Sequence, residues 1–235
     1  AGIQKNVTDW GSFSSKEIKE RRVAILIDNL QTSASYKLDE FHYSNFGYMI
    51  AACMAEQITG LSWEVLIKKR LFEPLGMNSV GFGAPNTLDQ IDQPWGHEKQ
   101  WHGYSWKPNQ SDNPEALSPA GRVHCTIDDW AKFISLQIIE ENAILDKEYL
   151  NRLIEPVGDH FYAGGWGVGE NDWANGIMIT HSGSNGLWYT SVVVTPILDR
   201  AFIVSTNSRD FGITADMCRD LMNKLIIMEL DLDKN

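Results

Sequence analysis

The stretch Phe41-His-Tyr-Ser-Asn-Phe-Gly-Tyr-Met-Ile50 decides how this chain of 235 residues is organised. It predicts a short extended run that ends at Tyr43-Ser44-Asn45, followed at once by an apolar helix that Gly60 ends. Polar side chains held on a short turn against a rigid helix are candidates for a functional site. The helix itself is expected to be buried on all sides, because apolar residues fill every face and recur at Ile50, Met54 and Ile58.

The composition predicts one sizeable core or two small ones, since 43% of the residues are hydrophobic. A net charge of −11 argues against nucleic acid or an anionic membrane as partner, because both select basic surfaces. No apolar run approaches the roughly 18 residues that a membrane span needs. The cysteines, Cys53, Cys125 and Cys218, are few and far apart, so we expect free thiols, with Cys53 and Cys218 buried, and no disulfide framework.

Helical patterns dominate the first 160 residues. A capping-box spacing at Ser14–Glu17 predicts a helix over 15–30, with an inward stripe of Val23, Leu26, Ile27 and Leu30. Ser62 is expected to cap the helix that follows Gly60 and carries Trp63, Leu66, Ile67 and Leu71 inward until Pro74. Thr126 opens another capping box, and Asp146 is expected to cap a short helix with Tyr149, Leu150 and Leu153 inward.

The periodicity changes after residue 160. Runs rich in β-branched and aromatic residues, bounded by turn residues, predict four neighbouring strands in an antiparallel meander over 161–168, 177–181, 187–195 and 201–206. A last helix over about 213–230 is expected to cover the sheet with Met217, Leu221, Met222 and Leu225. Helices, then strands, then a helix indicate an α+β fold with an antiparallel sheet flanked by helices. We therefore expect a helical region over 1–160 and a sheet with its C-terminal helix over 161–235.

The least regular region is the long loop over 81–119, which holds five of the eight prolines together with Trp95, Trp101 and Trp106. Loops of this length inside a compact domain are usually functional or disordered, and the tryptophans argue against disorder. We predict an ordered flap or wall.

Metal and phosphate sites are weakly indicated. His97 and His102 are one residue too far apart for the helical metal-binding pattern, and His42, His124 and His160 have no partner at ligand spacing. The residues are interpreted as ordinary polar or surface histidines, with no metal and no cofactor. The Gly-rich run 164–169 lacks the following lysine of a phosphate loop and is interpreted as a strand that permits close packing. No Gly-x-Ser-x-Gly nucleophile elbow occurs.

Two short motifs carry the functional argument. Tyr43-Ser44-Asn45 places a phenol and an amide one residue apart, and His181-Ser182-Gly183-Ser184-Asn185 follows a strand. Each alone has an ordinary structural explanation, namely a core tyrosine with a helix cap, and a strand that runs into a turn. Three further motifs accompany them: Pro74-Leu-Gly-Met77, Ser118-Pro-Ala-Gly121 and Trp188-Tyr-Thr-Ser-Val-Val-Val194.

In combination, order and spacing, these motifs resemble those of the serine β-lactamase and penicillin-binding-protein-like hydrolases. The branch with class C β-lactamases, D-alanyl-D-alanine peptidases and related esterases matches over nearly the whole chain. The resemblance implies a β-lactamase/transpeptidase-like fold and acyl-enzyme chemistry on amide, β-lactam or ester carbonyls of a small molecule or short peptide. Members of the family are often periplasmic or extracellular, but the sequence carries no visible localisation signal.

The resemblance also implies roles for the matching residues. Tyr43 corresponds to the tyrosine that moves a proton between nucleophile, lysine and leaving group, and Asn45 to the asparagine that holds the substrate amide or the lysine. His181 takes the place of the first residue of the Lys-Thr-Gly motif, as a cation or a hydrogen-bond donor. The neighbouring residues are implied to bind the substrate. Ser182 would hold a substrate carboxylate, Gly183 would let the substrate backbone lie against the strand, and the Ser184 N–H would donate to the oxyanion. Asn185 is a further implied substrate-binding residue.

One element of the family pattern is missing. The nucleophile and its activating lysine come from a Ser-x-x-Lys motif, and no lysine of this sequence has a serine three residues before it. Because Ala1-Gly2-Ile3 resembles the segment that follows that motif, we expect a truncated or processed chain that lacks the N-terminal strands and the nucleophile helix.

Three hypotheses remain. The chain is the C-terminal portion of a serine hydrolase, inactive by itself and paired with the missing N-terminal segment or with further copies of itself. Alternatively, it is a catalytically inactive binding or scaffold protein derived from that family. A new mechanism with Tyr43 or Ser182 as nucleophile is disfavoured, because neither has an evident base.

Overall fold

The computed structural model describes residues 2–7, 9–31, 34, 36–37, 40–85, 87, 89–90, 93–100, 105–139, 144–157, 160–210 and 212–232. The chain forms two compact units, Ala1–Pro85 with Ser111–Cys125, and Asn86–Gln110 with Thr126–Asn235. This division differs from the expected boundary near residue 160. Helix α5 (Ile127–Ser135) belongs to the second unit because it packs on the sheet of that unit.

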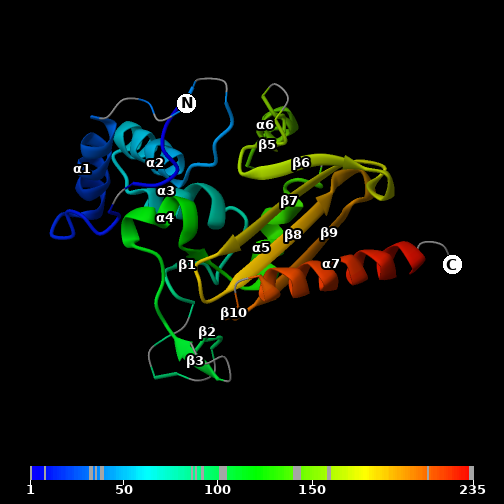
Figure 1. Ribbon diagram of the computed structural model, residues 1–235. Helices are drawn as coiled ribbons and strands as arrows, with labels where there is room; N and C mark the ends of the chain where they lie inside the picture. The colour runs from blue at the N-terminus through cyan, green and yellow to red at the C-terminus, as the bar shows by residue number, and fades with distance from the viewer. Residues whose placement is uncertain are drawn as a thin grey trace. The chain divides into compact units, whose positions relative to one another are not determined.

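The first unit is helical (Figure 1). Its elements are α1 (Ile18–Leu30), α2 (Asn45–Thr59), α3 (Trp63–Ile67), the π-helical turn η1 (Lys68–Phe72), the 3-10 turn η2 (Glu115–Leu117), α4 (Ser118–Gly121), and the short strands β1 (Gly81–Phe82) and β4 (Val123–His124), which pair antiparallel. The predicted limits of α2 are confirmed: the Ser44 hydroxyl accepts from the Gly47 N–H, and Gly60 ends the helix at φ 72°. Ser62 likewise caps α3.

The predicted burial of α2 on all sides is wrong. Its inner face is lined by Phe46, Met49, Ala52, Cys53 and Glu56, whereas Met54 and Ile58 are 62% and 82% exposed. Phe46, Met49 and Cys53 form one core cluster with Val7, Ile25 and Ala116. The helix therefore buries one face and leaves an apolar one uncovered.

The prediction for α1 also needs correction. The helix begins at Ile18, and its N-cap residue Glu17 makes no side-chain cap bond, so the capping box does not form. Of the predicted stripe, Val23, Ile27 and Leu30 are exposed, and the buried residues are Arg21, Arg22 and Ile25. The helix is turned this way because Arg22 pairs with Glu56 and Glu64 in the interior.

The second unit contains an antiparallel sheet in the order β5-β6-β7-β8-β9, which confirms the predicted meander. Its strands are β5 (Tyr162–Ala163), β6 (Trp166–Asn171), β7 (Gly176–Ser184), β8 (Tyr189–Thr195) and β9 (Arg200–Thr206), with 3-10 turns η3 (Asp172–Ala174) and η4 (Pro196–Leu198). The strand predicted over 161–168 is divided by a turn at Gly164 and Gly165, which have φ angles of 53° and 95°. Close packing occurs there, since a Cβ on Gly164 would lie 2.2 Å from the Leu153 carbonyl oxygen.

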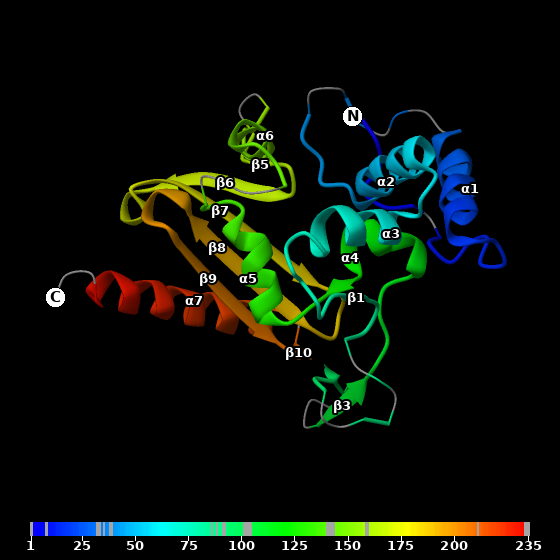
Figure 2. The same cartoon turned by 180° about the vertical axis from the view of Figure 1, so that it is seen from behind.

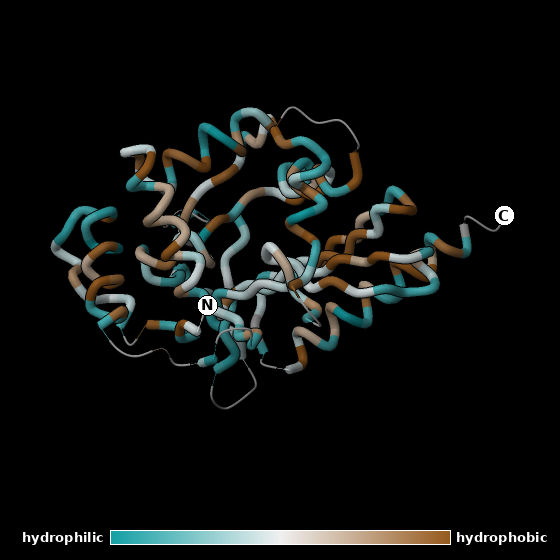
Figure 3. The backbone as a smooth tube through the Cα atoms, turned by 90° about the horizontal axis from the view of Figure 1, so that it is seen from above, coloured by the Kyte–Doolittle hydropathy of each residue, from teal (hydrophilic) through white to brown (hydrophobic). Residues whose placement is uncertain are grey.

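Helices cover both faces of this sheet (Figures 1 and 2). Side chains alternate across the sheet, so Val192 and Val194 pack with Ile134 of α5, while Val193 packs with α7 (Ile213–Leu232). Cys218, Met222 and Ile226 form the buried face of α7, whereas Met217 and Leu221 are 66% and 48% exposed, so the face predicted for this helix is only partly right. Figure 3 shows hydrophobic and hydrophilic residues alternating along the helices.

Helix α6 (Lys147–Leu153) was predicted to have three inward residues, but only Leu150 of these is buried. Tyr149 and Leu153 are exposed, and Asp146 makes no side-chain cap bond.

The long Trp-bearing segment contributes strands β2 (Gly96–Lys99) and β3 (Trp106–Asn109), which the sequence did not indicate. They form a sheet in the order β10-β2-β3, with β10 spanning Ser208–Arg209. Trp101 and the connection at Ser33 and Ser35 lie outside the described residues.

Within the described part of the chain, no single helix is long and apolar enough to cross a membrane. The bent pair Asn45–Thr59 and Trp63–Phe72 passes that test of length and composition only when its two arms, 80° apart, are taken together.

Candidate functional site

The predicted site residues fall into two groups, one in each unit. Tyr43 and Asn45 belong to the first unit, and the segment His181–Asn185 belongs to the second. Each group is therefore described within its own unit.

The first group lies at the N-terminus of α2, against the segment 3–7. The Ser44 hydroxyl donates to the Gln4 carbonyl (2.7 Å) while it caps the helix, and the Phe46 N–H donates to the Lys5 carbonyl (3.2 Å). Gly47 leaves room for Ile3, whose Cδ1 would lie 3.2 Å from a Cβ at that position. The serine of the motif is thus a structural residue that fixes the turn.

Polar side chains of the N-terminal segment join this turn. The Lys5 ammonium lies 5.9 Å from the centroid of the Tyr43 ring, and the Asn45 amide donates to Asn6 Oδ1 (2.8 Å). Tyr43 is 38% exposed, so its ring is accessible to solvent. Lys5 and Asn6 were missed by sequence reasoning, because nothing in the spacing links them to residues so far along the chain. Together the four side chains combine a phenol, a cation and two amides.

The second group lies at the end of β7, where one edge of the strand is open. His181–Ser184 pair with Tyr189–Val192 of β8, but the pairing of β7 with β6 ends at Thr180 and Gly167. Among the strands that the structure describes, none pairs with the other edge of His181–Ser184. An open strand edge can bind an extended ligand through backbone hydrogen bonds.

His181 begins this open segment. A hydrogen bond joins its Nε2 and the Tyr162 hydroxyl (3.2 Å), and the two rings are 6.3 Å apart at 56°. Burial lowers the pKa of His181 below its ordinary value of 6.5. Of the two roles that the motif allows, hydrogen-bond donor and cation, this environment favours the neutral donor at pH 7. Tyr162 was not singled out in the sequence, where it precedes a glycine pair without any motif.

The remaining predicted residues shape the β7–β8 turn. The Ser182 hydroxyl donates to the Ser191 hydroxyl (3.1 Å), and a Cβ on Gly183 would meet only Thr190, at 3.8 Å. The Ser184 hydroxyl donates to the Trp188 carbonyl (2.8 Å), while Asn185 Oδ1 accepts the N–H groups of Leu187 and Trp188, both at 3.1 Å. The Ser184 hydroxyl and the Asn185 oxygen therefore hold the turn.

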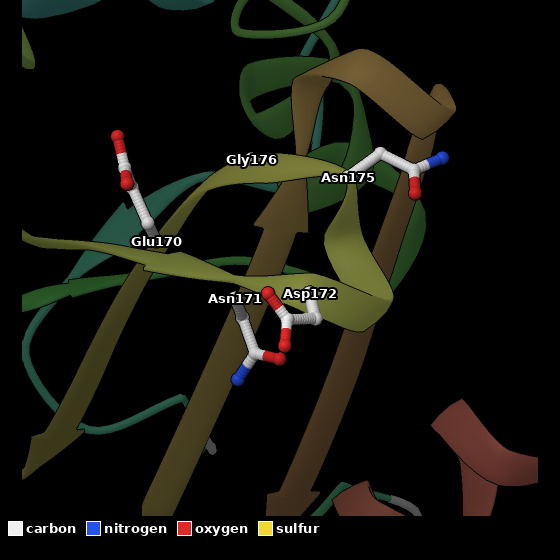
Figure 4. A pocket seen from close by; sticks show the side chains of 5 residues that line it. All are labelled: Glu170, Asn171, Asp172, Asn175 and Gly176. Carbon is white, nitrogen blue, oxygen red and sulfur yellow. The ribbon is translucent and has the colours of Figure 1, made fainter.

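A polar hollow of about 640 Å³ lies at the opposite end of β7. It is lined by Glu170, Asn171, Asp172, Asn175 and Gly176, and the side chains of the first four point in different directions (Figure 4). It is open to solvent and contains none of the predicted site residues. We give greater weight to the edge of β7, where chemically suitable groups converge.

The histidines considered for metal binding make other contacts. His97 and His124 each place Nδ1 against a backbone carbonyl, of Asn207 (3.2 Å) and Gly83 (2.8 Å) respectively. His102 lies outside the described residues. Among the residues that are described, no three His, Cys, Asp or Glu side chains form a group that could hold a metal ion.

Comparison with known proteins gives consistent matches. Residues 30–223 match the family model described as Beta-lactamase. The chain is 22% identical over 154 residues to "Beta-lactamase-like protein 2" of Dictyostelium discoideum, an alignment of 65% of this chain and 26% of that protein.

Solved structures share the fold. The octameric penicillin-binding protein homologue from Pyrococcus abyssi superposes with a TM-score of 0.71 at 25% identity, over 88% of this chain and 47% of that one. The D-stereospecific amidohydrolase from Streptomyces sp. gives a TM-score of 0.66 at 17% identity, over 88% of this chain and 65% of that one. The chain thus spans only part of the length of each of these relatives.

Proposed function

This chain belongs to the beta-lactamase family of serine hydrolase-like proteins, and from that premise we propose that it carries part of an acyl-transfer site. In the proposed reaction, a serine attacks an amide, β-lactam or ester carbonyl, forms an acyl-enzyme and loses the acyl group to water. The observation that carries the proposal is the open edge of β7, which presents His181-Ser182-Gly183 where a substrate backbone can pair. The proposed substrate is a small molecule or short peptide, with ester or peptide bonds preferred because His181 stands where β-lactamases more often have lysine.

The proposed roles follow from the chemistry of each group. Tyr43, with Lys5 beside its ring, transfers a proton to or from the nucleophile, and the Asn45 amide orients the substrate or the catalytic lysine. His181 donates a hydrogen bond toward developing negative charge. Ser182 holds a substrate carboxylate, Gly183 allows close approach of the substrate backbone, the Ser184 N–H is an oxyanion donor, and Asn185 keeps the substrate-binding turn in shape.

We propose that the serine and lysine of the Ser-x-x-Lys motif lie outside these 235 residues. The absence of the motif from the sequence supports this, and so does the greater length of the relatives. An inactive binding or scaffold protein is the alternative, and the labelling experiment below distinguishes the two.

Exposed apolar faces support a partner for the chain. Met54 and Ile58 of α2 are mostly exposed, and so is the α7 stripe of Ile213, Met217, Leu221 and Met228. Uncovered apolar surface of this kind costs about 25 cal/mol per Å². Either the missing N-terminal segment or further copies of the chain would cover it, and the Pyrococcus homologue is itself octameric. A monodisperse, protease-resistant monomer in light scattering and limited proteolysis would contradict this part of the proposal.

The test is covalent labelling of material purified from its source. The sample is incubated with a fluorescent penicillin and, separately, with a fluorophosphonate, and then examined by denaturing mass spectrometry and peptide mapping. An adduct on a Ser-x-x-Lys peptide outside residues 1–235 is the expected result. An adduct on Ser182 or another residue of this chain would overturn the assignment, and no adduct at all would favour the binding or scaffold alternative.

Replacing Tyr43 by Phe tests the proposed role of Tyr43 by the same labelling, in a protein that also carries the Ser-x-x-Lys serine. Loss of the phenol oxygen is expected to slow acylation about a hundredfold or more, in the range of general acid–base catalysis. Tyr48→Phe is the matched control, because Tyr48 lies on α2 and has the same 38% exposure. Equal acylation rates of the Tyr43→Phe variant and the wild type would remove Tyr43 from the mechanism.

A further inference from the structure

Tyr162 lies at a defined position beside the open edge of β7. It belongs to β5, which pairs with β6 at Tyr162 and Gly167, and Gly167 in turn pairs with Thr180, next to His181. The Tyr162 hydroxyl is 3.2 Å from Nε2 of His181. The hydrogen bond therefore joins β5 to β7, the two strands that flank β6, and its two residues are 19 apart in the sequence.

The hairpin that carries Tyr162 has little freedom to move. Gly164 adopts a φ of 53°, and a Cβ there would lie 2.2 Å from the carbonyl oxygen and 3.1 Å from the Cβ of Leu153. The turn between β5 and β6 thus packs directly on the backbone at the end of α6. The main chain two residues after Tyr162 is therefore held by packing that does not depend on the hydrogen bond.

The chemistry of the two groups favours one direction of the hydrogen bond. A neutral imidazole has one nitrogen that donates and one that accepts. Burial favours this neutral form of His181, since it lowers the pKa of the ring. A phenol is a stronger acid than a neutral imidazole N–H, which favours the arrangement in which the hydroxyl donates and Nε2 accepts. The ring proton is then on Nδ1.

We infer that Tyr162 is a positioning residue that holds His181 in the Nδ1–H tautomer at the open edge of β7. Nε2 is occupied as an acceptor, so it is not the nitrogen through which His181 donates to a substrate. Nδ1–H is the remaining donor of the ring. His181 therefore acts as an oriented neutral donor and not as a replacement for the positive charge of a lysine.

The tautomer can be measured directly in the 235-residue chain, without any assumption about activity. Long-range nitrogen–proton NMR spectra of labelled protein at pH 7.5, with the His181 signals identified by a His181→Asn variant, distinguish protonated from unprotonated ring nitrogens. We expect an unprotonated Nε2 in the wild type and a shift toward the Nε2–H form in Tyr162→Phe. Tyr149→Phe, which removes a phenol oxygen from the exposed face of α6, should leave the signals unchanged.

Either of two results overturns the inference. One is a wild-type ring that already carries its proton on Nε2, a result that needs no variant and so does not depend on the folding of Tyr162→Phe. The other is a Tyr162→Phe protein with native amide spectra and an unchanged His181 tautomer.

A second measurement rests on the proposed function and uses the acylating form of the protein. Tyr162→Phe is expected to reduce the second-order rate constant of acylation about fivefold, corresponding to one net hydrogen bond. Tyr149→Phe should acylate at the wild-type rate. A wild type that never acylates would count against the proposed function and leave the NMR result to decide the tautomer. If the wild type is acylated and Tyr162→Phe is acylated at the same rate, the positioning role is refuted.

Discussion

Replacing Arg22 by Met is expected to destabilise the helical unit by about 3–5 kcal/mol, the usual cost of removing one partner from a buried ion pair. The Arg22 side chain is fully buried, and its guanidinium donates to Glu56 Oε1 (2.6 Å), to both carboxylate oxygens of Glu64 and to the Ala116 carbonyl (3.4 Å). Burial by itself would lower the pKa of Arg22 and raise that of Glu64. The hydrogen bonds and the charge attraction between the two side chains outweigh this effect of burial, so the pKa of Arg22 is raised and the pKa of Glu64 is lowered.

The size of the loss depends mainly on Glu56. Its side chain is 3% exposed, and its Oε2 has no hydrogen-bond partner within the described part of the chain. Without Arg22, Glu56 would keep only the bond from the Trp63 N–H (2.8 Å) and would remain a buried charge without a cation. Glu64, with 20% of its side chain exposed, can be partly hydrated. A double variant, Arg22→Met with Glu56→Met, removes both charges and should recover at least about 2 kcal/mol of the loss.

Urea unfolding followed by circular dichroism at pH 7.5 measures these free energies. Arg219→Met is the matched control, because Arg219 forms an exposed ion pair with Asp216 and should change the stability by less than about 0.5 kcal/mol. The reasoning would be refuted by a loss below about 1 kcal/mol for Arg22→Met, or by a double variant less stable than the single one.

Three further predictions concern other parts of the chain. Gly164→Ala should destabilise the sheet unit by about 1–3 kcal/mol in the same urea assay. Gly169→Ala should cost far less, because no atom of the described residues lies within 4 Å of a Cβ at that position. Equal effects would contradict the close packing of Gly164 on Leu153. In the folded protein Cys125 should react with a disulfide reagent before the other two cysteines. Burial raises the pKa of the Cys53 thiol to about 11 and also raises the pKa of the Cys218 thiol, so both are poor nucleophiles. Rapid reaction of all the thiols before unfolding would argue against this burial. Because the folded-state pKa of His181 is lowered, its contribution to stability is fully present above about pH 6.5 and is lost as the pH falls through the folded-state pKa. The stability of His181→Asn should therefore decrease less than that of the wild type between pH 7.5 and 5, and parallel curves would contradict it.

Local patterns were sufficient for the elements whose ends depend on their own residues. Ser62 and Thr126 cap the helices that they were expected to cap, and Gly60 ends α2 as predicted, although the residue that caps α2 is Ser44, which was not singled out. The antiparallel meander also followed from the sequence, because a period of two with tight turns specifies neighbouring strands. The motifs Tyr43-Ser44-Asn45 and His181-Ser182-Gly183, taken with the three accompanying motifs and their order along the chain, indicated the family.

Burial of helix faces was predicted less well. On α1, three residues of the predicted hydrophobic stripe, Val23, Ile27 and Leu30, are exposed, while Leu26 packs against the core. Arg22 points inward, because the carboxylates of Glu56 and Glu64, from other helices, meet it there. On α2 and α7, apolar residues occupy more of the helix than the described core covers, so periodicity alone did not identify the buried side.

The sequence by itself determined the fold class, the order of the strands and the two motifs, since these depend on short-range propensities and on residue identities. Only the tertiary structure brought Lys5 and Asn6 to the Tyr43 turn, and Tyr162 to His181, because these contacts join residues far apart along the chain. The open edge of β7 is also a tertiary property: it exists because β6 stops pairing at Gly167 while β8 continues to Tyr189. No local pattern encodes where a neighbouring strand ends.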